Sequence, residues 1–283
     1  MSGIVREFVG LPSPLTGRAG AGGHPCQGVY HRPAGNPPRT AFIATHYNVD
    51  FSEHYLAEHL ATRGYGFLGW NTRFRGNEAH FLLDHALAEI GTGVRWLREH
   101  AGAERIVLLG NSGGGSLMAA YQSQAVEPNV TPVAGMRPVS AIEDLPAGDL
   151  FIALAAHSGR PEVLTAWMDP SVTDETDPLS ADPALDPFNP ENGPPYDALR
   201  TWLSMWSLRT SQCAAAPHLA RITAPSLVVH ATADECVYDS DARAVFDALA
   251  SSDKTLDFIK DTHYLPRSRA WVADLMDAWV RDH

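Results

Sequence analysis

The sequence is poor in three features that would each point to a particular class of protein. It has only three cysteines, Cys26, Cys213 and Cys236, and a sparse, odd count argues against a disulfide framework. Basic residues number 21 against 33 acidic ones, so the net charge of −12 offers no electrostatic footprint for nucleic acid or an anionic membrane. No run approaches the roughly 20 apolar residues that cross a bilayer, and residues 1–15 lack a signal-peptide pattern. We therefore expect a cytoplasmic protein that binds neither nucleic acid nor membrane.

Apolar segments of strand length alternate with amphipathic segments of helix length, which predicts βαβ units and a mostly parallel sheet flanked by helices. The first 40 residues, rich in Gly and Pro, predict an irregular entry or a short β-hairpin. The expected strands are residues 41–45, 66–70, 105–110, 133–136, 226–230 and 255–259. The expected helices are residues 51–63, 82–100, from about 115, 240–250 and 267–281.

The alternation stops between residues 137 and 217, a segment that contains 11 of the 21 prolines. We interpret it as an inserted cap, with residues 1–136 and 218–283 forming the core and one helix expected at 196–211. Trp167, Trp202 and Trp206 need apolar surface to cover, which favours a cap over the sheet edge rather than a surface excursion without a role. The excess of acidic residues in this segment should then face solvent and disfavour strongly anionic substrates.

The pattern G-x-S-x-G occurs once between a predicted strand and a predicted helix, at Gly110-Asn-Ser-Gly-Gly114. Glycines permit a turn tight enough to lift the hydroxyl of Ser112 above the sheet edge, where it can act as a nucleophile. The backbone N–H of Gly113 would lie at a helix N-terminus and could stabilise an oxyanion. The alternative, a glycine-rich turn or phosphate-binding loop, is weaker because no lysine follows.

A serine hydroxyl needs a base that takes its proton, and the base needs an acid that orients it. His263 follows the last predicted strand, and Asp234 follows the strand before it, so both come after Ser112 in the required order. Glu235 is the alternative acid. His54 with His59, and His80 with His85, could suggest zinc, but the H-E-x-x-H spacing is missing. We expect no metal and no cofactor.

A second oxyanion donor should come from the loop after the strand 41–45, which reads Thr45-His-Tyr-Asn48. The backbone N–H of Tyr47 or Asn48 is the candidate. The Tyr47 hydroxyl or the Asn48 amide could add a further donor, or could serve packing and the turn.

Four segments resemble the α/β-hydrolase superfamily: the turn Gly110–Gly114, the loop Thr45–Asn48, Ala-Thr-Ala-Asp234 and Asp-Thr-His263-Tyr. The resemblance covers residues 40–135 and 218–283. The resemblance implies Ser112, Asp234 and His263 as a catalytic triad and the loop at His46 as the oxyanion loop. Two features differ from the common family pattern: Tyr47 stands where glycine is frequent, and Asn71–Gly76 lacks the usual glycine spacing. Within the latter, Arg73 and Arg75 either line the site or pair with acids on the surface.

The resemblance implies a serine hydrolase that cleaves a carboxylic ester or a related acyl bond through an acyl-enzyme. A C–C bond hydrolase or an acyltransferase on the same scaffold is the first alternative, and a non-catalytic ligand-binding homologue is the second. The expected partner is a small-molecule acyl substrate, bound by His46, Trp202 and Trp206. The oligomeric state stays open.

Overall fold

A computed structural model describes residues 3–15, 26–164, 174, 176–177, 180, 182 and 202–283. Within these residues, eight strands form one sheet in the order β1-β2-β4-β3-β5-β6-β7-β8. The pairs β1–β2 and β2–β4 are antiparallel, and every other pair is parallel. The strands are β1 (Ile4–Leu11), β2 (Cys26–Pro33), β3 (Thr40–Ala44), β4 (Gly66–Asn71), β5 (Arg105–Asn111), β6 (Leu150–Leu154), β7 (Ser226–Ala231) and β8 (Lys254–Ile259).

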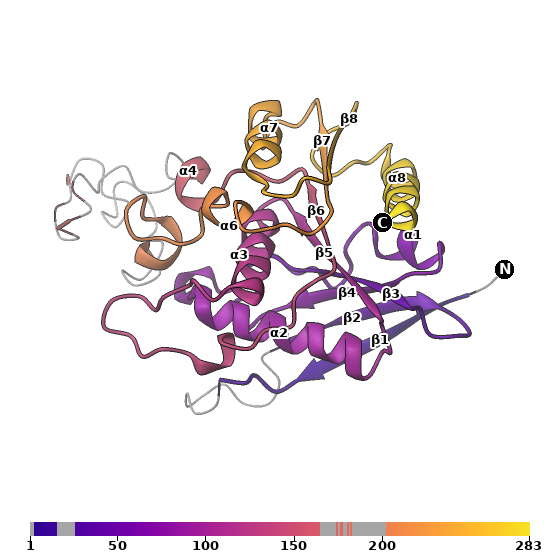
Figure 1. Ribbon diagram of the computed structural model, residues 1–283, viewed down its shortest axis with the longest axis horizontal. Helices are drawn as coiled ribbons and strands as arrows, with labels where there is room; N and C mark the ends of the chain where they lie inside the picture. Colours follow the sequence, from indigo (N-terminus) through magenta and orange to yellow (C-terminus); the bar gives the residue numbers. More distant parts are fainter. Residues whose placement is uncertain are drawn as a thin grey trace.

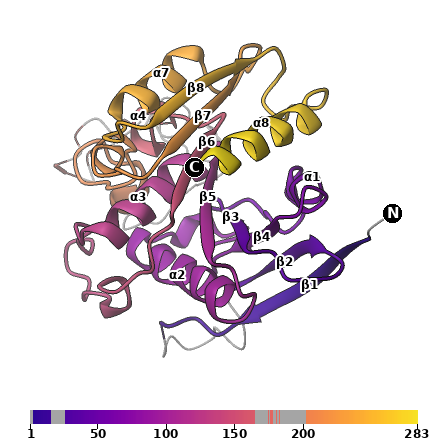
Figure 2. The same ribbon diagram turned by 45° about the vertical axis from the view of Figure 1, so that its right-hand side comes forward.

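Helices cover both faces of the sheet (Figure 1), because alternate residues of each inner strand point to opposite sides. Ile43 of β3 packs in the core beneath α2, α3 and α7, whereas its neighbour Phe42 packs in the core beneath α1 and α8. Figure 2 shows α1 and α8 together on one side, away from α2 and α3. The helices are α1 (Ala57–Ala61), α2 (Leu83–Glu99), α3 (Gly114–Val126), α4 (Arg160–Leu164), α6 (Ala216–Leu219), α7 (Asp239–Ala248) and α8 (Arg269–Asp282). Single turns are Glu78–His80 and Ser140–Ile142, both 3₁₀, and Trp202–Trp206, which is π-helical.

None of the described helices has the length and apolar character needed to cross a bilayer.

The predicted mostly parallel sheet with flanking helices is confirmed, but two elements differ from the prediction. The helix expected at 51–63 shortens to Ala57–Ala61. The strand expected at 133–136 is wrong: this segment contains no strand, and Gly135 turns the chain with a φ of +81°. The strand that pairs with β5 is β6, whose five residues are all buried.

The predicted boundary of the insertion at residue 137 is therefore too early, because β6 lies within 137–217 and belongs to the sheet. An antiparallel bridge between Gly159 and Ala214 joins the two ends of the chain excursion that follows β6. Most of this excursion, including Trp167 and the predicted helical residues 196–201, lies outside the described residues. Of the expected helix, 202–206 form one turn and 207–211 are not helical.

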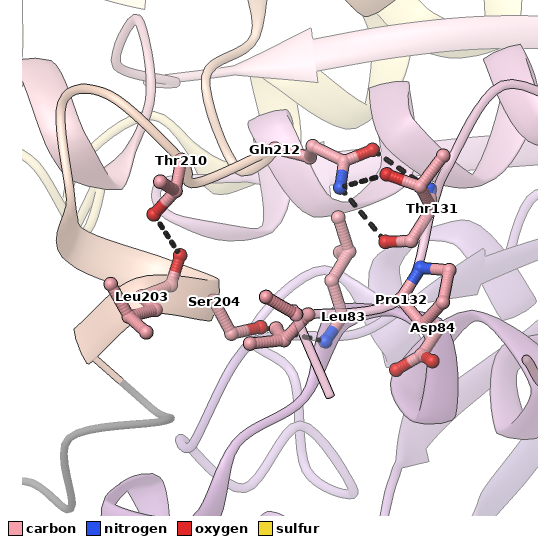
Figure 3. Close-up of a pocket in the computed structure, with 10 residues that line it drawn as sticks. Leu83, Asp84, Thr131, Pro132, Leu203, Ser204, Thr210 and Gln212 are labelled. Carbon is pink, nitrogen blue, oxygen red and sulfur yellow. Dashed lines mark hydrogen bonds between the residues drawn. The ribbon is translucent and has the colours of Figure 1, made fainter. Parts of the chain in front are cut away.

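A pocket of about 200 Å³ lies where the excursion returns to the core (Figure 3). Leu83 and Asp84 at the start of α2 form one wall, and Leu203 with Ser204 forms another. The Ser204 hydroxyl accepts a hydrogen bond from the Leu83 backbone N–H, and Gln212 bonds the backbone of Thr131. These contacts attach the returning chain to the core. Ser112, Asp234 and His263 do not line this pocket.

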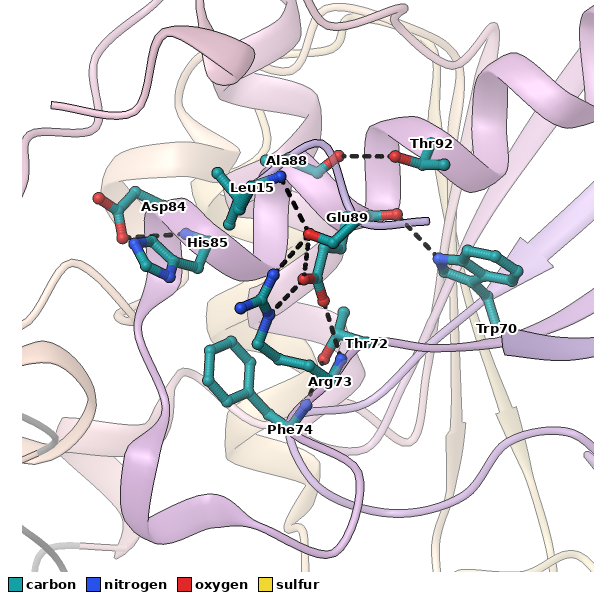
Figure 4. Close-up of polar contacts among 11 residues, drawn as sticks. Leu15, Trp70, Thr72, Arg73, Phe74, Asp84, His85, Ala88, Glu89 and Thr92 are labelled. Atoms are coloured by element: carbon teal, nitrogen blue, oxygen red, sulfur yellow. Dashed lines mark hydrogen bonds and ion pairs between the residues drawn. The ribbon is translucent and has the colours of Figure 1, made fainter. Parts of the chain in front are cut away.

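A buried ion pair joins the loop after β4 to α2 (Figure 4). The Glu89 side chain has no exposed surface, and the Arg73 guanidinium donates to its carboxylate. The same carboxylate accepts hydrogen bonds from the Arg73 backbone N–H at 2.8 Å and from the Ser13 hydroxyl at 2.7 Å. Arg75 instead pairs with the exposed Asp50. Neither arginine lines the pocket that contains Ser112.

Candidate active site

Ser112 stands at a sharp turn between β5 and α3. Its φ is +54°, a left-handed conformation that a non-glycine residue rarely adopts. The turn is held by the Ser112 N–H, which donates to Leu154 O of β6 at 3.0 Å. A Cβ on Gly110 would stand 2.6 Å from Gly115 Cα, and one on Gly114 would stand 2.3 Å from Thr45 O. The glycines are thus required by close backbone approach, as the motif predicts.

The structure brings Ser112, His263 and Asp234 into one hydrogen-bond chain. His263 Nε2 lies 3.1 Å from Ser112 Oγ, and His263 Nδ1 lies 2.6 Å from Asp234 Oδ2. If Nδ1–H donates to the carboxylate, Nε2 is left as the acceptor for the serine hydroxyl proton. This arrangement can activate a hydroxyl nucleophile.

The carboxylate of Asp234 is enclosed and accepts three hydrogen bonds. Burial opposes its ionisation, but the hydrogen bond from His263 and the backbone N–H groups of Cys236 and Val237 outweigh burial and lower the pKa of Asp234. Glu235, the alternative acid, is exposed, and the carboxylate that bonds His263 Nδ1 is that of Asp234. A buried aspartate, Asp261, accepts from two backbone N–H groups of the loop that carries His263.

The expected oxyanion donors differ in their availability. The backbone N–H groups of Gly113 and Tyr47 have no acceptor among the described residues, whereas the Asn48 N–H donates to His46 Nδ1 at 3.4 Å. The side chains point elsewhere: the Tyr47 hydroxyl lies 2.9 Å from Ser116 Oγ, and the Asn48 amide donates to Glu78. The side-chain alternatives therefore correspond to packing and turn contacts.

Two residues beside Ser112 were not singled out from the sequence as a pair. The Asn111 amide donates to Leu154 O at 2.9 Å, and its Oδ1 lies 3.0 Å from His54 Nε2. His54 Nδ1 accepts from the Leu56 N–H, so Nε2 carries the proton and donates to Asn111. Burial lowers the pKa of His54 to about 4, which keeps the ring neutral. Asn111 occupies the first variable position of G-x-S-x-G, and this position next to the serine is the sequence feature from which its role could have been predicted.

Ser112 opens onto a pocket of about 230 Å³ lined by His46, Phe51, His54, His263 and Tyr264, among others. His46, expected to contact substrate, therefore lies at the site. Its Nδ1 accepts from backbone N–H groups, and burial followed by the nearby charge of Arg160 lowers its pKa well below the usual value. The ring is thus neutral, with Nε2–H facing Gly113.

The predicted substrate-binding tryptophans have different outcomes. Trp206 is buried, and its ring lies 5.1 Å from the guanidinium carbon of Arg160, so it packs beside the site without being on the surface of the 230 Å³ pocket. The side chain of Trp202 lies outside what the structure describes. The sequence analysis did not identify Arg160 as a site residue.

None of the four histidines considered for zinc belongs to a cluster of three potential metal ligands in the described residues. In the described part of the chain, the one cluster of three potential metal ligands is Asp234, Cys236 and His263, which coincides with the hydrogen-bond chain to Ser112.

The chain is similar to known hydrolases in sequence and in fold. A family model described as serine aminopeptidase, S33, matches residues 38–263. Est1E from Butyrivibrio proteoclasticus superposes with a TM-score of 0.61 at 16% identity, over 91% of this chain and 93% of that chain. A monoacylglycerol lipase from Paleococcus ferrophilus gives 0.54 at 16% identity, over 99% of both chains.

A solved structure reported with the metagenome-derived lipolytic enzymes LipS and LipT gives a TM-score of 0.59 at 16% identity, over 87% of this chain and 95% of that chain. A search of proteins with curated descriptions finds no significant match. At such identities the structural likeness shows the fold alone. The family model, however, spans most of the chain and includes every residue of the hydrogen-bond chain from Ser112 to His263. The chain belongs to the serine aminopeptidase S33 family of hydrolases and has the α/β-hydrolase fold.

Proposed function

We propose that the protein hydrolyses carboxylic esters, with Ser112 as nucleophile, His263 as general base and Asp234 as the acid that orients it. The observation that carries the proposal is the continuous hydrogen-bond chain from Asp234 through His263 to a serine held at a φ of +54°. The lipolytic and esterase neighbours support the choice of ester over other acyl bonds.

In the proposed cycle, Ser112 Oγ attacks the ester carbonyl while its proton passes to His263 Nε2. The N–H of Gly113 and the N–H of Tyr47 or Asn48 stabilise the oxyanion. His263 then gives the proton to the departing alkoxide, leaving an acyl-enzyme. Water, deprotonated by His263, attacks the acyl carbon, and the carboxylic acid and free Ser112 are restored.

The partner in this proposal is a small acyl compound that enters the 230 Å³ pocket, with His46 on its wall. Est1E has been solved with ferulic acid bound, and that acid illustrates the size of product that we propose here. We further propose that the excursion after β6, including Trp202 and Trp206, forms a cap over the site, and that the chain works in a reducing cytoplasm, where its three free cysteines stay thiols.

The decisive test combines a fluorophosphonate probe with a panel of p-nitrophenyl esters of increasing acyl length. The wild type should be labelled and should hydrolyse the esters. Ser112→Ala should lose labelling and about a millionfold in kcat while staying folded. More than about a tenth of the activity left in Ser112→Ala would contradict the assignment of the nucleophile.

A matched pair of variants tests the acid. Asp234→Asn should lower kcat about 10⁴-fold because the wrong tautomer of His263 is then stabilised, and Glu235→Gln should change kcat far less. The reverse order would assign the acid to Glu235. Labelling without ester hydrolysis would favour the C–C bond hydrolase or acyltransferase, and absence of labelling would favour a non-catalytic homologue.

A further inference from the structure

Arg160, the first residue of α4, is a buried cation that pairs with no acid of the described residues. The residue is 7% exposed, and its Nε atom is enclosed without a hydrogen-bond partner. Its guanidinium carbon lies 4.7 Å from the centre of the Tyr47 ring and 5.1 Å from that of Trp206. No carboxylate of the described residues pairs with it, and its two terminal nitrogens make no hydrogen bond there and are not enclosed.

Four described titratable groups interact electrostatically with Arg160, and each of them is uncharged near neutral pH. Burial, followed by the charge of Arg160, lowers the pKa of His46 and lowers that of His157 to about 4. Burial raises the pKa of Tyr47 and raises that of Cys213 to about 11. Arg160 is therefore a single positive charge among neutral groups, with a rigid fork of donors that fits one carboxylate.

The guanidinium lies next to the proposed oxyanion donor. A Cβ built on Gly113 would stand 3.3 Å from Arg160 Nη2 and 2.7 Å from His46 Nε2. With a carbon–carbon bond of about 1.5 Å, Nη2 is therefore within about 5 Å of Gly113 Cα. Only a group separated from the scissile carbonyl by a few bonds can bridge so short a distance.

A buried charge without a partner is strongly unfavourable, and aromatic rings compensate only part of that cost. An arginine kept in such a place is best explained by a ligand that brings the missing negative charge. The net charge of −12 does not exclude an anion, because exposed charges are screened beyond about 8 Å at physiological salt. The net charge of the chain therefore does not decide whether an anion can bind at Arg160.

We propose that Arg160 binds a carboxylate carried by the acyl group of the substrate, so that the preferred substrates are half esters of short dicarboxylic acids. This inference rests on the proposed ester hydrolysis at Ser112 and specifies its substrate class. Two or three methylenes between the carboxylate and the ester carbonyl match the short separation of Arg160 Nη2 from Gly113. The rings of Tyr47 and Trp206 both contact the guanidinium and restrict its position.

The test compares monoethyl succinate with ethyl succinamate, an uncharged ester of nearly the same shape, by titrating the acid released. The wild type should show a kcat/KM at least about tenfold higher for monoethyl succinate, in line with a charged hydrogen bond. The preference should decline for monoethyl adipate. Arg160→Met should abolish the preference, and Arg160→Lys, which keeps the charge but not the fork, should restore part of it.

Arg243→Met is the matched control, because Arg243 also stacks on a ring, that of Phe258 at 4.9 Å, but is exposed and is not one of the groups nearest to Gly113. It should keep the wild-type ratio. Equal loss for both esters in Arg160→Met would overturn the proposal and assign Arg160 to the oxyanion or to packing. A wild type without preference would overturn it as well.

The failure of this inference is distinguishable from failure of the proposed function. If the fluorophosphonate probe labels Ser112 and ethyl succinamate is hydrolysed, the proposed function stands whatever the ratio of the two esters. If the probe does not label Ser112 and neither ester is hydrolysed, the proposed function fails and the substrate class fails with it.

Discussion

Arg73 and Arg160 both have guanidinium groups that are largely withdrawn from solvent, yet their surroundings differ. Arg73 meets the fully buried carboxylate of Glu89 and also bonds Ser13, so every charge in that network has a partner within the chain. Arg160 meets two aromatic rings and neutral histidines. Among the described residues, Arg73 has an acid as its partner and Arg160 has none, and we propose that this difference separates a structural cation from one that binds a ligand.

The largest effect should follow from breaking the partnered pair. Arg73→Met leaves the Glu89 carboxylate buried and unpaired, so the free energy of unfolding should fall by about 3–5 kcal/mol. Denaturant titration measures it. The double variant Arg73→Met/Glu89→Leu should recover most of the loss, because an apolar pair replaces both charges. A loss below about 1 kcal/mol in the single variant would show that the pair is not a structural one.

The next effect concerns the pH dependence of stability near Arg160. Burial and then Arg160 lower the pKa of His157 to about 4, against about 6.5 in the unfolded chain. The neutral His157 ring thus contributes up to about 3 kcal/mol to the free energy of unfolding. This contribution is fully present above pH 6.5 and is lost as the pH falls towards 4. Between pH 6.5 and 4, the free energy of unfolding of His157→Asn should therefore fall by up to about 3 kcal/mol less than that of the wild type. Denaturant titration at several pH values measures the difference. Parallel profiles for the two proteins would contradict the lowered pKa.

Removal of the unpartnered cation should be milder than removal of the partnered one. Arg160→Met breaks no ion pair and loses two cation–π contacts, while the cost of burying a charge disappears. The free energy of unfolding should change by less than about 2 kcal/mol in either direction, as thermal and denaturant unfolding would report. Destabilisation as large as that of Arg73→Met would remove the distinction between the two arginines.

The smallest effect is expected for Arg75, whose ion pair with Asp50 is exposed on both sides. Arg75→Gln should cost no more than about 1 kcal/mol, and less in high salt, because solvent screens such pairs. This measurement gives the contribution of an exposed ion pair to the free energy of unfolding, and the buried pair of Arg73 and Glu89 can be compared with it. A cost equal to that of Arg73→Met would mean that burial does not decide the energy of these pairs.

Local sequence patterns were sufficient to predict the strand, turn and helix that position Ser112. Glycines at 110 and 114 are required by backbone approach, and a motif of that kind is visible in a short stretch of sequence. The segments around Asp234 and His263 could also be selected, because each follows an apolar run that becomes a buried strand or its neighbour. Chain order then limited which acid and which base could meet the serine.

Other features depend on contacts that no local pattern contains. Leu150–Leu154 is a buried strand whose flanking prolines suggested an insertion, and Val133–Met136 is apolar but turns at Gly135. The importance of Arg160 arises from Tyr47 and Trp206, which are distant in sequence and meet only in the folded chain. That no acid of the described residues pairs with it is likewise visible only in the folded chain.

The bridge between Gly159 and Ala214 has a consequence for how such a protein can be altered. Because the two ends of the excursion are already fastened together, the sheet does not depend on the length of the chain between them, and doubling a flexible loop costs only about 0.6 kcal/mol. Met205 and Trp206, however, belong to the hydrophobic core, so the part of the excursion that could vary in length is the part before them. Arg160 lies just inside the excursion, next to Gly159. A change in this segment therefore alters the charge that faces Gly113 without changing the residues of the hydrogen-bond chain, Ser112, His263 and Asp234.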